Sequence, residues 1–121
     1  MSSIKRILCA EPNGDTCELI RLLLQQEGYE VKSASSVTDS LRLATSERFD
    51  LYILNDEYFD GDGIELCRRL RELHPGTPLL LISENASAPD HRRGLSAGTQ
   101  AYIKTPEGLN NLVQTVNALL K

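Results

Sequence analysis

Residues 51–57 read LYILNDE, and this stretch decides how the rest of the chain is interpreted. Four apolar residues in a row, without alternation, are typical of a strand covered on both faces, as in a parallel sheet. The polar residues follow Leu54 at once, so Asn55 marks the predicted end of the strand. A strand that ends in this way holds one polar side chain where chemistry can occur. That side chain is an amide, and the functional interpretation depends on it.

Similar segments occur before and after this stretch. Apolar runs at Ile7–Ala10 and Leu79–Ile82 predict two more buried strands, and Glu30–Ala34 and Ala101–Ile103 predict shorter, peripheral ones. Five helices are expected to follow the strands. The apolar positions expected to face the core at helical spacing are Leu19, Ile20, Leu23, Leu24, Val37, Leu41, Ala44, Ile64, Cys67, Leu70, Leu109, Leu112, Val113, Val116 and Leu120.

The helix boundaries are predicted from capping residues. Gly28 closes the first helix, the sequence from Ser36 to Asp39 resembles a capping box for the second, and Pro75-Gly76 ends the third. Residues 60–63 form a turn that caps the third helix. Pro89 opens a short fourth helix that stops at Gly98, and Thr105, followed by Pro106, is the expected N-cap of the fifth.

Five strands alternating with five helices predict a single α/β domain over residues 1–121, with helices on both faces of a doubly wound parallel sheet. In such sheets functional groups collect beyond the carboxyl ends of the strands. The candidate site residues are those that follow the predicted strands: Glu11, Pro12, Asn55, Asp56, Glu57, Ser83, Glu84, Lys104 and Thr105.

Composition narrows the classes of function. The net charge of −4 argues against a nucleic-acid partner, and no segment approaches the about 18 apolar residues that a membrane helix needs. The three cysteines match no metal-binding or disulfide spacing, so buried thiols in a reducing cytosol are expected. These features predict a cytoplasmic protein.

Several short segments together resemble one known family. They are Ile7–Pro12, Glu27–Val31, Phe49–Leu51, Asp62–Leu66, Ala97-Gly98, and Tyr102 before Pro106. In their order and spacing the chain resembles a receiver domain of two-component response regulators, the CheY-like family, over essentially its whole length. The resemblance implies a flavodoxin-like sheet with strand order 2-1-3-4-5.

The family's phosphorylation pocket is altered at three of its five positions. The resemblance places Glu11 and Pro12 at the acidic pair that holds Mg²⁺, and Asn55 at the phosphoacceptor aspartate. Ser83 matches the pocket hydroxyl, while Thr105 stands at the lysine position. A lysine is displaced one place back, to Lys104.

These changes predict that ordinary phosphotransfer is lost. A carboxamide cannot form the acyl phosphate of an aspartate. Mg²⁺ prefers hard anionic oxygens, so binding is expected to be weak or absent; Glu11 alone is a weak candidate for a cation site. The uncharged Thr105 cannot stabilise a transferred phosphoryl group. No cofactor and no enzyme activity are expected.

Tyr102 and Ser83 resemble the family's switch pair, in which an aromatic side chain and a hydroxyl respond to the occupied pocket. A half-buried strand aromatic and a loop-capping serine are an equally good interpretation. Asp56 is expected to point out of the pocket, because one step along an extended chain reverses side-chain direction.

The preferred interpretation is a stand-alone pseudo-receiver that acts by protein–protein interaction without phosphorylation. Its expected partners are a sensor kinase, another regulator or an effector, bound through the face from Pro89 to Lys121; a homodimer through this face is also considered. Two alternatives stay open. One is an unorthodox phosphoacceptor that uses Asp56, and the other is a small-ligand-binding domain or enzyme on a flavodoxin-like fold.

Overall fold

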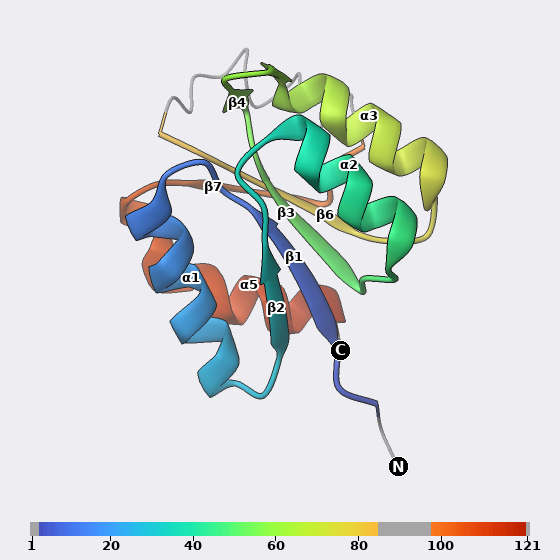
Figure 1. Cartoon of the computed structure of the whole chain (residues 1–121). Helices are drawn as coiled ribbons and strands as arrows, with labels where there is room; N and C mark the ends of the chain where they lie inside the picture. The colour runs from blue at the N-terminus through green and yellow to red at the C-terminus, as the bar shows by residue number, and fades with distance from the viewer. Residues whose placement is uncertain (1–2, 85–97, 121) are drawn as a thin grey trace.

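Five parallel strands form the central sheet of the computed structural model, which describes residues 3–84 and 98–120. The strand order is β2-β1-β3-β6-β7, which confirms the predicted order 2-1-3-4-5 because β6 and β7 are the fourth and fifth strands of this sheet (Figure 1). The strands are β1 (Arg6–Ala10), β2 (Glu30–Ser33), β3 (Leu51–Asn55), β6 (Leu79–Ser83) and β7 (Ala101–Lys104).

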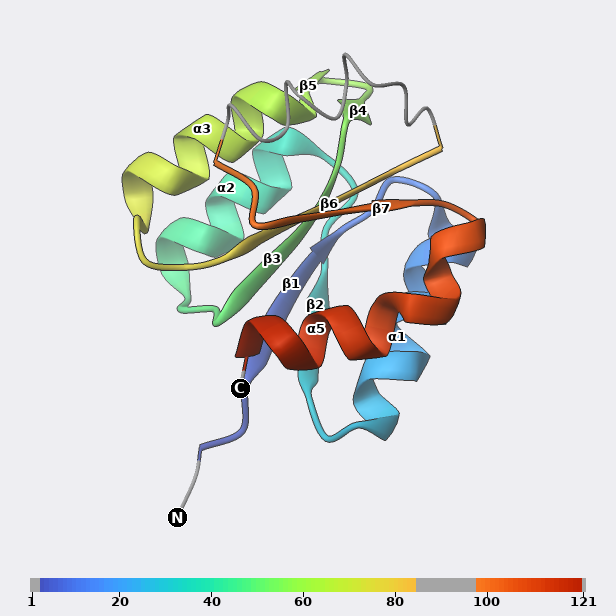
Figure 2. The ribbon, with the colours of Figure 1, turned by 180° about the vertical axis from the view of Figure 1, so that it is seen from behind.

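Helices cover both faces of the sheet. One face carries α1 (Gly14–Gln26) and α5 (Leu112–Leu120), and the other carries α2 (Val37–Ser46) and α3 (Gly63–Leu73) (Figures 1 and 2). The fourth helix expected from Pro89 to Gly98 lies almost wholly at residues 85–97, outside the described residues. Among the residues described, no helix has the length and apolar character needed to cross a bilayer.

The strands are apolar on both sides because the sheet separates two hydrophobic clusters. Leu8, Tyr52 and Leu81 face α2 and α3, whereas their neighbours Cys9, Ile53 and Ile82 face α1 and α5. Successive side chains of a strand point to opposite faces, so each of these runs supplies both cores at once. The uninterrupted apolar runs in the sequence therefore have a direct structural cause.

Helix α1 differs in one respect from the sequence prediction. Leu19 is 45% exposed, and the buried stripe consists of Cys17, Ile20 and Leu24. The apolar stripe begins one half-turn earlier than expected because Cys17, a small hydrophobic residue when buried, occupies the first inward position. Gly28 adopts a φ of 91° just after the helix, the left-handed conformation that favours glycine at this position.

The fifth helix does not begin with Thr105 as its N-cap. The Thr105 backbone N–H donates to the Ser83 carbonyl at 2.9 Å, so this residue continues the pairing between β6 and β7. After the cis Thr105–Pro106 peptide bond comes a 3-10 turn, η1 (Glu107–Asn111), which has no side-chain cap, and α5 starts only at Leu112. The sheet hydrogen bond thus overrides the capping signal in the sequence.

A short antiparallel hairpin, which the sequence analysis did not predict, connects β3 to α3. It consists of β4 (Glu57–Tyr58) and β5 (Gly61–Asp62). Asp62 caps α3 by accepting from the Ile64 N–H at 2.8 Å, as expected for this turn. Asp60 serves a different helix: its carboxylate accepts from the N–H groups of Val37 and Thr38 at the start of α2.

Candidate functional site

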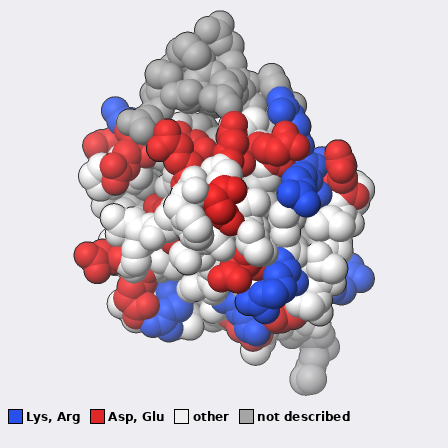
Figure 3. Space-filling view, turned by 45° about the horizontal axis from the view of Figure 1, so that its top comes forward, with Lys and Arg blue, Asp and Glu red and all other residues white. Residues whose placement is uncertain are grey.

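The carboxyl ends of β1 and β3 border a cleft of about 200 Å³. Its described lining consists of Glu11, Pro12, Asn13, Asn55, Asp56, Glu57 and Glu84. Four of these seven residues are carboxylates, and a band of Asp and Glu side chains is visible over this end of the molecule (Figure 3). The cleft therefore has strongly acidic walls.

The central contact of the cleft joins Asn55 to Glu11. The Asn55 Nδ2 group donates to Glu11 Oε1 at 3.1 Å and to Oε2 at 3.0 Å. On its other side, Asn55 Oδ1 accepts the Glu57 backbone N–H at 3.2 Å. An acceptor on one side and an N–H donor on the other fix the orientation of the amide. Both hydrogen-bonding ends of the Asn55 side chain are therefore engaged inside the protein.

Tyr58 holds the backbone beneath this contact. Its hydroxyl accepts the Asn55 backbone N–H at 2.9 Å and donates to the Ala10 carbonyl, so one side chain links the ends of β1 and β3. Burial raises the pKa of this hydroxyl well above its ordinary value, which keeps it protonated as a donor. Sequence patterns carry no strong signal for this role, because Tyr58 lies in a polar loop segment.

Gly63 allows α3 to approach the end of β3 closely. A Cβ atom at this position would lie 1.8 Å from the Asn55 carbonyl oxygen and 2.7 Å from Asp56 Cα. The Gly63 N–H also donates to the Asp56 carbonyl at 3.0 Å. The backbone that carries Asn55 and Asp56 is therefore pinned by direct contact with the first turn of α3.

The Glu11 carboxyl is buried, with an exposed fraction of 5%. This burial raises the pKa of Glu11 to about 7, although hydrogen bonds from Asn13 and Asn55 act in the opposite direction, and the charges of Cys17 and Glu84 add to the rise. The Asn55 amide supplies hydrogen bonds but no positive charge. Glu11 therefore changes its ionisation near neutral pH.

The remaining candidate residues are distributed unevenly around the cleft. Asp56 lines it together with Asn55, and its expected direction out of the pocket held only for a regular extended chain, which this segment is not. The strict side-chain alternation ends with β3, because the chain bends at Asp56 into the hairpin. Ser83 and Thr105 are buried and are not among the described lining residues, whereas Lys104 is exposed. Tyr102 is half-buried and packs against the cluster that faces α2 and α3.

The donor set at this edge does not suit Mg²⁺. Both Glu11 oxygens already accept from the Asn55 amide, and Pro12 has no side-chain oxygen. Mg²⁺ needs near-ideal octahedral geometry and releases its water reluctantly. Across residues 3–84 and 98–120, no group of three or more His, Cys, Asp or Glu side chains is placed to hold a metal ion.

Comparisons with known proteins agree on one family. The family model described as "Response regulator receiver domain" matches residues 7–117. The response regulator MprA of Mycolicibacterium vanbaalenii is 32% identical over 116 residues, which cover 96% of this chain and 50% of that protein. MprA of Mycobacterium leprae is 30% identical over 116 residues, with 96% and 51% covered. The chain thus spans about half the length of these curated relatives.

A solved structure of a receiver domain protein is also similar to this chain. The receiver domain protein (CheY-like) from Methanospirillum hungatei JF-1 superimposes with a TM-score of 0.92 at 29% identity. The match covers 98% of this chain and 94% of that chain.

Proposed function

This chain belongs to the response regulator receiver family, and we propose that it is a pseudo-receiver, a module of two-component signalling that binds other proteins without being phosphorylated. The proposal rests on the altered pocket described above. It concerns the cleft at the carboxyl ends of the strands, where the resemblance to the family places the phosphoacceptor aspartate.

The observation that carries the proposal is the pair of hydrogen bonds from Asn55 Nδ2 to Glu11. The position expected to hold a nucleophilic carboxylate instead holds a donor that engages the remaining acid. An amide cannot attack a phosphoryl donor to give an acyl phosphate. Attack by Asn55 would also require it to leave Glu11, whose buried carboxylate would then lose its partner.

The charge in the cleft further opposes phosphotransfer. Phosphoryl donors are anionic, and the described cleft walls carry Glu11, Asp56, Glu57 and Glu84. In an active receiver, a magnesium ion and a lysine would offset such repulsion. Pro12 and Thr105 stand at the positions that the resemblance gives to one metal ligand and to that lysine. A phosphoryl group brought into this cleft would therefore lack counter-charge.

Intact-mass spectrometry after incubation with acetyl phosphate and Mg²⁺ tests this proposal. The wild type is expected to show no gain of about 80 Da, and Asn55→Asp alone is expected to behave alike, because Pro12 and Thr105 remain. The matched positive control combines Pro12→Asp, Asn55→Asp and Thr105→Lys, which restores all three altered groups. A phosphoryl gain by the wild type would refute the proposal.

Asp56 as an unorthodox phosphoacceptor is a second candidate, because its carboxylate shares the cleft with Glu11 and Asn55. The same incubation separates the two functions. A mass gain in the wild type that disappears in Asp56→Asn would favour this candidate. A wild type that stays unmodified under conditions where the triple variant is phosphorylated would exclude it.

For partner binding we propose the face from Pro89 to Lys121, of which β7 and α5 are described. A sensor kinase, another regulator or an effector is the expected partner, and a second copy of the chain is an alternative occupant. Tyr102, half-buried on β7, is the residue to change. Affinity capture with tagged protein should lose its partner in Tyr102→Ala but retain it in Leu19→Ala, where an exposed α1 side chain provides the control.

A further inference from the structure

Two of the three cysteines lie side by side, although their spacing in the sequence matches no metal-binding or disulfide pattern. Cys9 on β1 and Cys17 in the first turn of α1 have their sulfur atoms 3.8 Å apart. Cys67, on α3, belongs to the hydrophobic cluster on the opposite face of the sheet. The chain has no further cysteine. Cys67 can therefore serve as an internal control for the reactivity of the Cys9–Cys17 pair.

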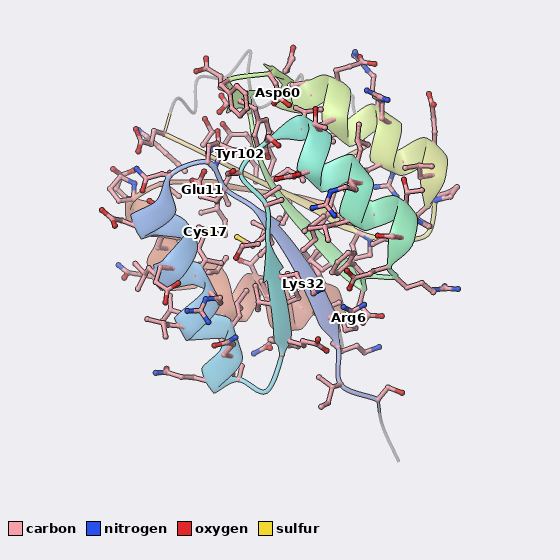
Figure 4. All side chains as sticks on the ribbon, in the orientation of Figure 1. Arg6, Glu11, Cys17, Lys32, Asp60 and Tyr102 are labelled. Atoms are coloured by element: carbon pink, nitrogen blue, oxygen red, sulfur yellow. The ribbon has the colours of Figure 1, made fainter. Side chains whose placement is uncertain are left out.

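The pair is reachable from solvent on one side. Cys9 is fully buried, but Cys17 lines a second cleft of about 330 Å³. This cleft lies between the β1–α1 and β2–α2 connections, and its walls include Glu11, Gly14, Ser33 and Asp39. Figure 4 shows Cys17 next to Glu11 where β1 passes into α1. A small oxidant in this cleft would lie next to Cys17, whose sulfur is 3.8 Å from that of Cys9.

From this arrangement we infer that Cys9 and Cys17 form a redox-active dithiol, which hydroperoxides convert to an intramolecular disulfide. This inference is independent of the proposed pseudo-receiver function. Disulfides in reducing compartments are typically transient and redox-sensing, so such a pair agrees with the free thiols of the present structure.

The chemistry balances with hydrogen peroxide as the oxidant. The Cys17 thiolate attacks one peroxide oxygen, the O–O bond breaks, and a sulfenic acid forms; the released hydroxide takes up the proton that Cys17 had lost and leaves as water. The Cys9 sulfur then attacks the sulfenic sulfur, the S–O bond breaks, and the second water leaves. Two thiols and one peroxide become one disulfide and two waters, with both thiol hydrogens in the water.

Geometry and ionisation both assign the attacking role to Cys17. A hydrogen bond with the Cys9 thiol, helped by Ser33, lowers the pKa of Cys17 to about 6, and the hydrogen bond with Cys17 together with burial raises that of Cys9 well above its usual range. Burial raises the pKa of Cys67 to about 12, so this third thiol is expected to react far more slowly than Cys17.

Bond formation requires only a local movement. The sulfurs must approach by about 1.8 Å to reach the disulfide length of about 2.0 Å. Cys17 lies in the same helical turn as Gly14, where an added Cβ would meet nothing within 4 Å. The disulfide would tie α1 to β1, which ends just before Glu11, a wall residue of the acidic cleft.

Peptide mapping of the native chain tests this inference directly. Trypsin cleaves after Arg6 and Arg21, so Cys9 and Cys17 fall in one peptide, residues 7–21. After mild peroxide treatment and alkylation under denaturing conditions, this peptide should carry no alkyl group and should be about 2 Da lighter than its reduced form, while Cys67 is alkylated. Dithiothreitol should restore two alkylation sites to the peptide. We expect Cys17 to be consumed at least about tenfold faster than Cys67.

Two variants separate the roles of the thiols. Cys67→Ala should leave the disulfide unchanged, and Cys9→Ser should leave a Cys17 sulfenic acid that dimedone traps. If a variant fails to fold, the wild-type peptide map alone decides. Alkylation of both cysteines in peptide 7–21 after peroxide, or consumption of Cys67 at the same rate, would overturn the inference.

Discussion

At the amino-terminal edge of the sheet, the Arg6 guanidinium pairs with Glu30 and Glu47, and Lys32 Nζ lies 2.9 Å from the second Glu47 oxygen. At the carboxyl edge, Glu11 receives an uncharged amide and a backbone N–H. The same residue type therefore shows opposite behaviour. Hydrogen bonds from Arg6 and Lys32 lower the pKa of Glu47, whereas burial raises that of Glu11 to about 7.

The two edges of the sheet differ in their effect on the free energy of folding. The amino edge stabilises the fold, whereas the buried acid at the carboxyl edge destabilises it. Arg6 and Lys32 favour the ionised form of Glu47, so this edge contributes to stability at neutral pH. The carboxyl edge keeps a buried acid near other acids, which is costly for folding and typical of functional clefts. The carboxyl edge thus has the acidic walls of a functional cleft, although its central residue is an amide.

Gly63→Ala should have the largest effect, because it disrupts the backbone of the carboxyl edge itself. The added Cβ would lie 1.8 Å from the Asn55 carbonyl oxygen, and backbone cannot yield as a flexible side chain does. We expect a loss of about 3 kcal/mol in the free energy of unfolding, measured by urea denaturation. Gly14→Ala, with open space around its Cβ, is the control and should not be destabilised comparably.

Glu11→Gln tests the cost of the buried acid. The pKa of Glu11 is raised from 4.5 to about 7 in the folded state, so the folded protein binds the proton more tightly. The wild type should therefore lose stability as the pH rises from 4.5 to 7. Relative to the wild type, the variant should gain about 2–3 kcal/mol across this window, measured by denaturant titration at each pH. A pH-independent difference between the two would contradict the assignment.

Tyr58→Phe removes the hydroxyl that links the two strand ends. The Asn55 N–H and the Ala10 carbonyl would lose their partner, which should destabilise the protein by about 1–2 kcal/mol. Tyr52→Phe is the matched control, because the Tyr52 hydroxyl is buried without a hydrogen-bond partner among the described residues. Thermal unfolding of the two variants should shift the Tm downward only for Tyr58→Phe.

Glu47→Gln should have the smallest effect, at the opposite edge. The pKa of Glu47 is lowered in the folded state, so its contribution is present above its ordinary pKa of 4.5 and is lost as the pH falls. The variant should be slightly less stable than the wild type at pH 7, and this difference should fade below pH 4 and in high salt. A deficit that persists in high salt would indicate a packing role instead.

The sequence was sufficient to predict the sheet and the proximity of Glu11 to Asn55. Apolar runs such as Leu79–Ile82 identify buried strands, and parallel strands bring their carboxyl ends to one edge. The family resemblance added the strand order. These features are local in sequence or follow from topology, so no knowledge of individual contacts is required.

Contacts between distant or irregular segments were beyond this kind of prediction. Asp60 caps α2 across more than twenty residues, and no local pattern points to its partner. The two-residue strands of the hairpin are too short to show alternation, so the role of Tyr58 was missed. Cys9 and Cys17 are eight residues apart, and only the turn from β1 into α1 brings their sulfurs together.

The hairpin also offers a site for a fluorescent probe. Phe59 is 88% exposed, yet both of its neighbours are held by hydrogen bonds. Tyr58 is bonded to β1, and Asp60 is bonded to the start of α2. The chain contains no tryptophan. In Phe59→Trp the indole would therefore be the protein's only source of tryptophan fluorescence, and this signal would respond to binding at this end of the sheet.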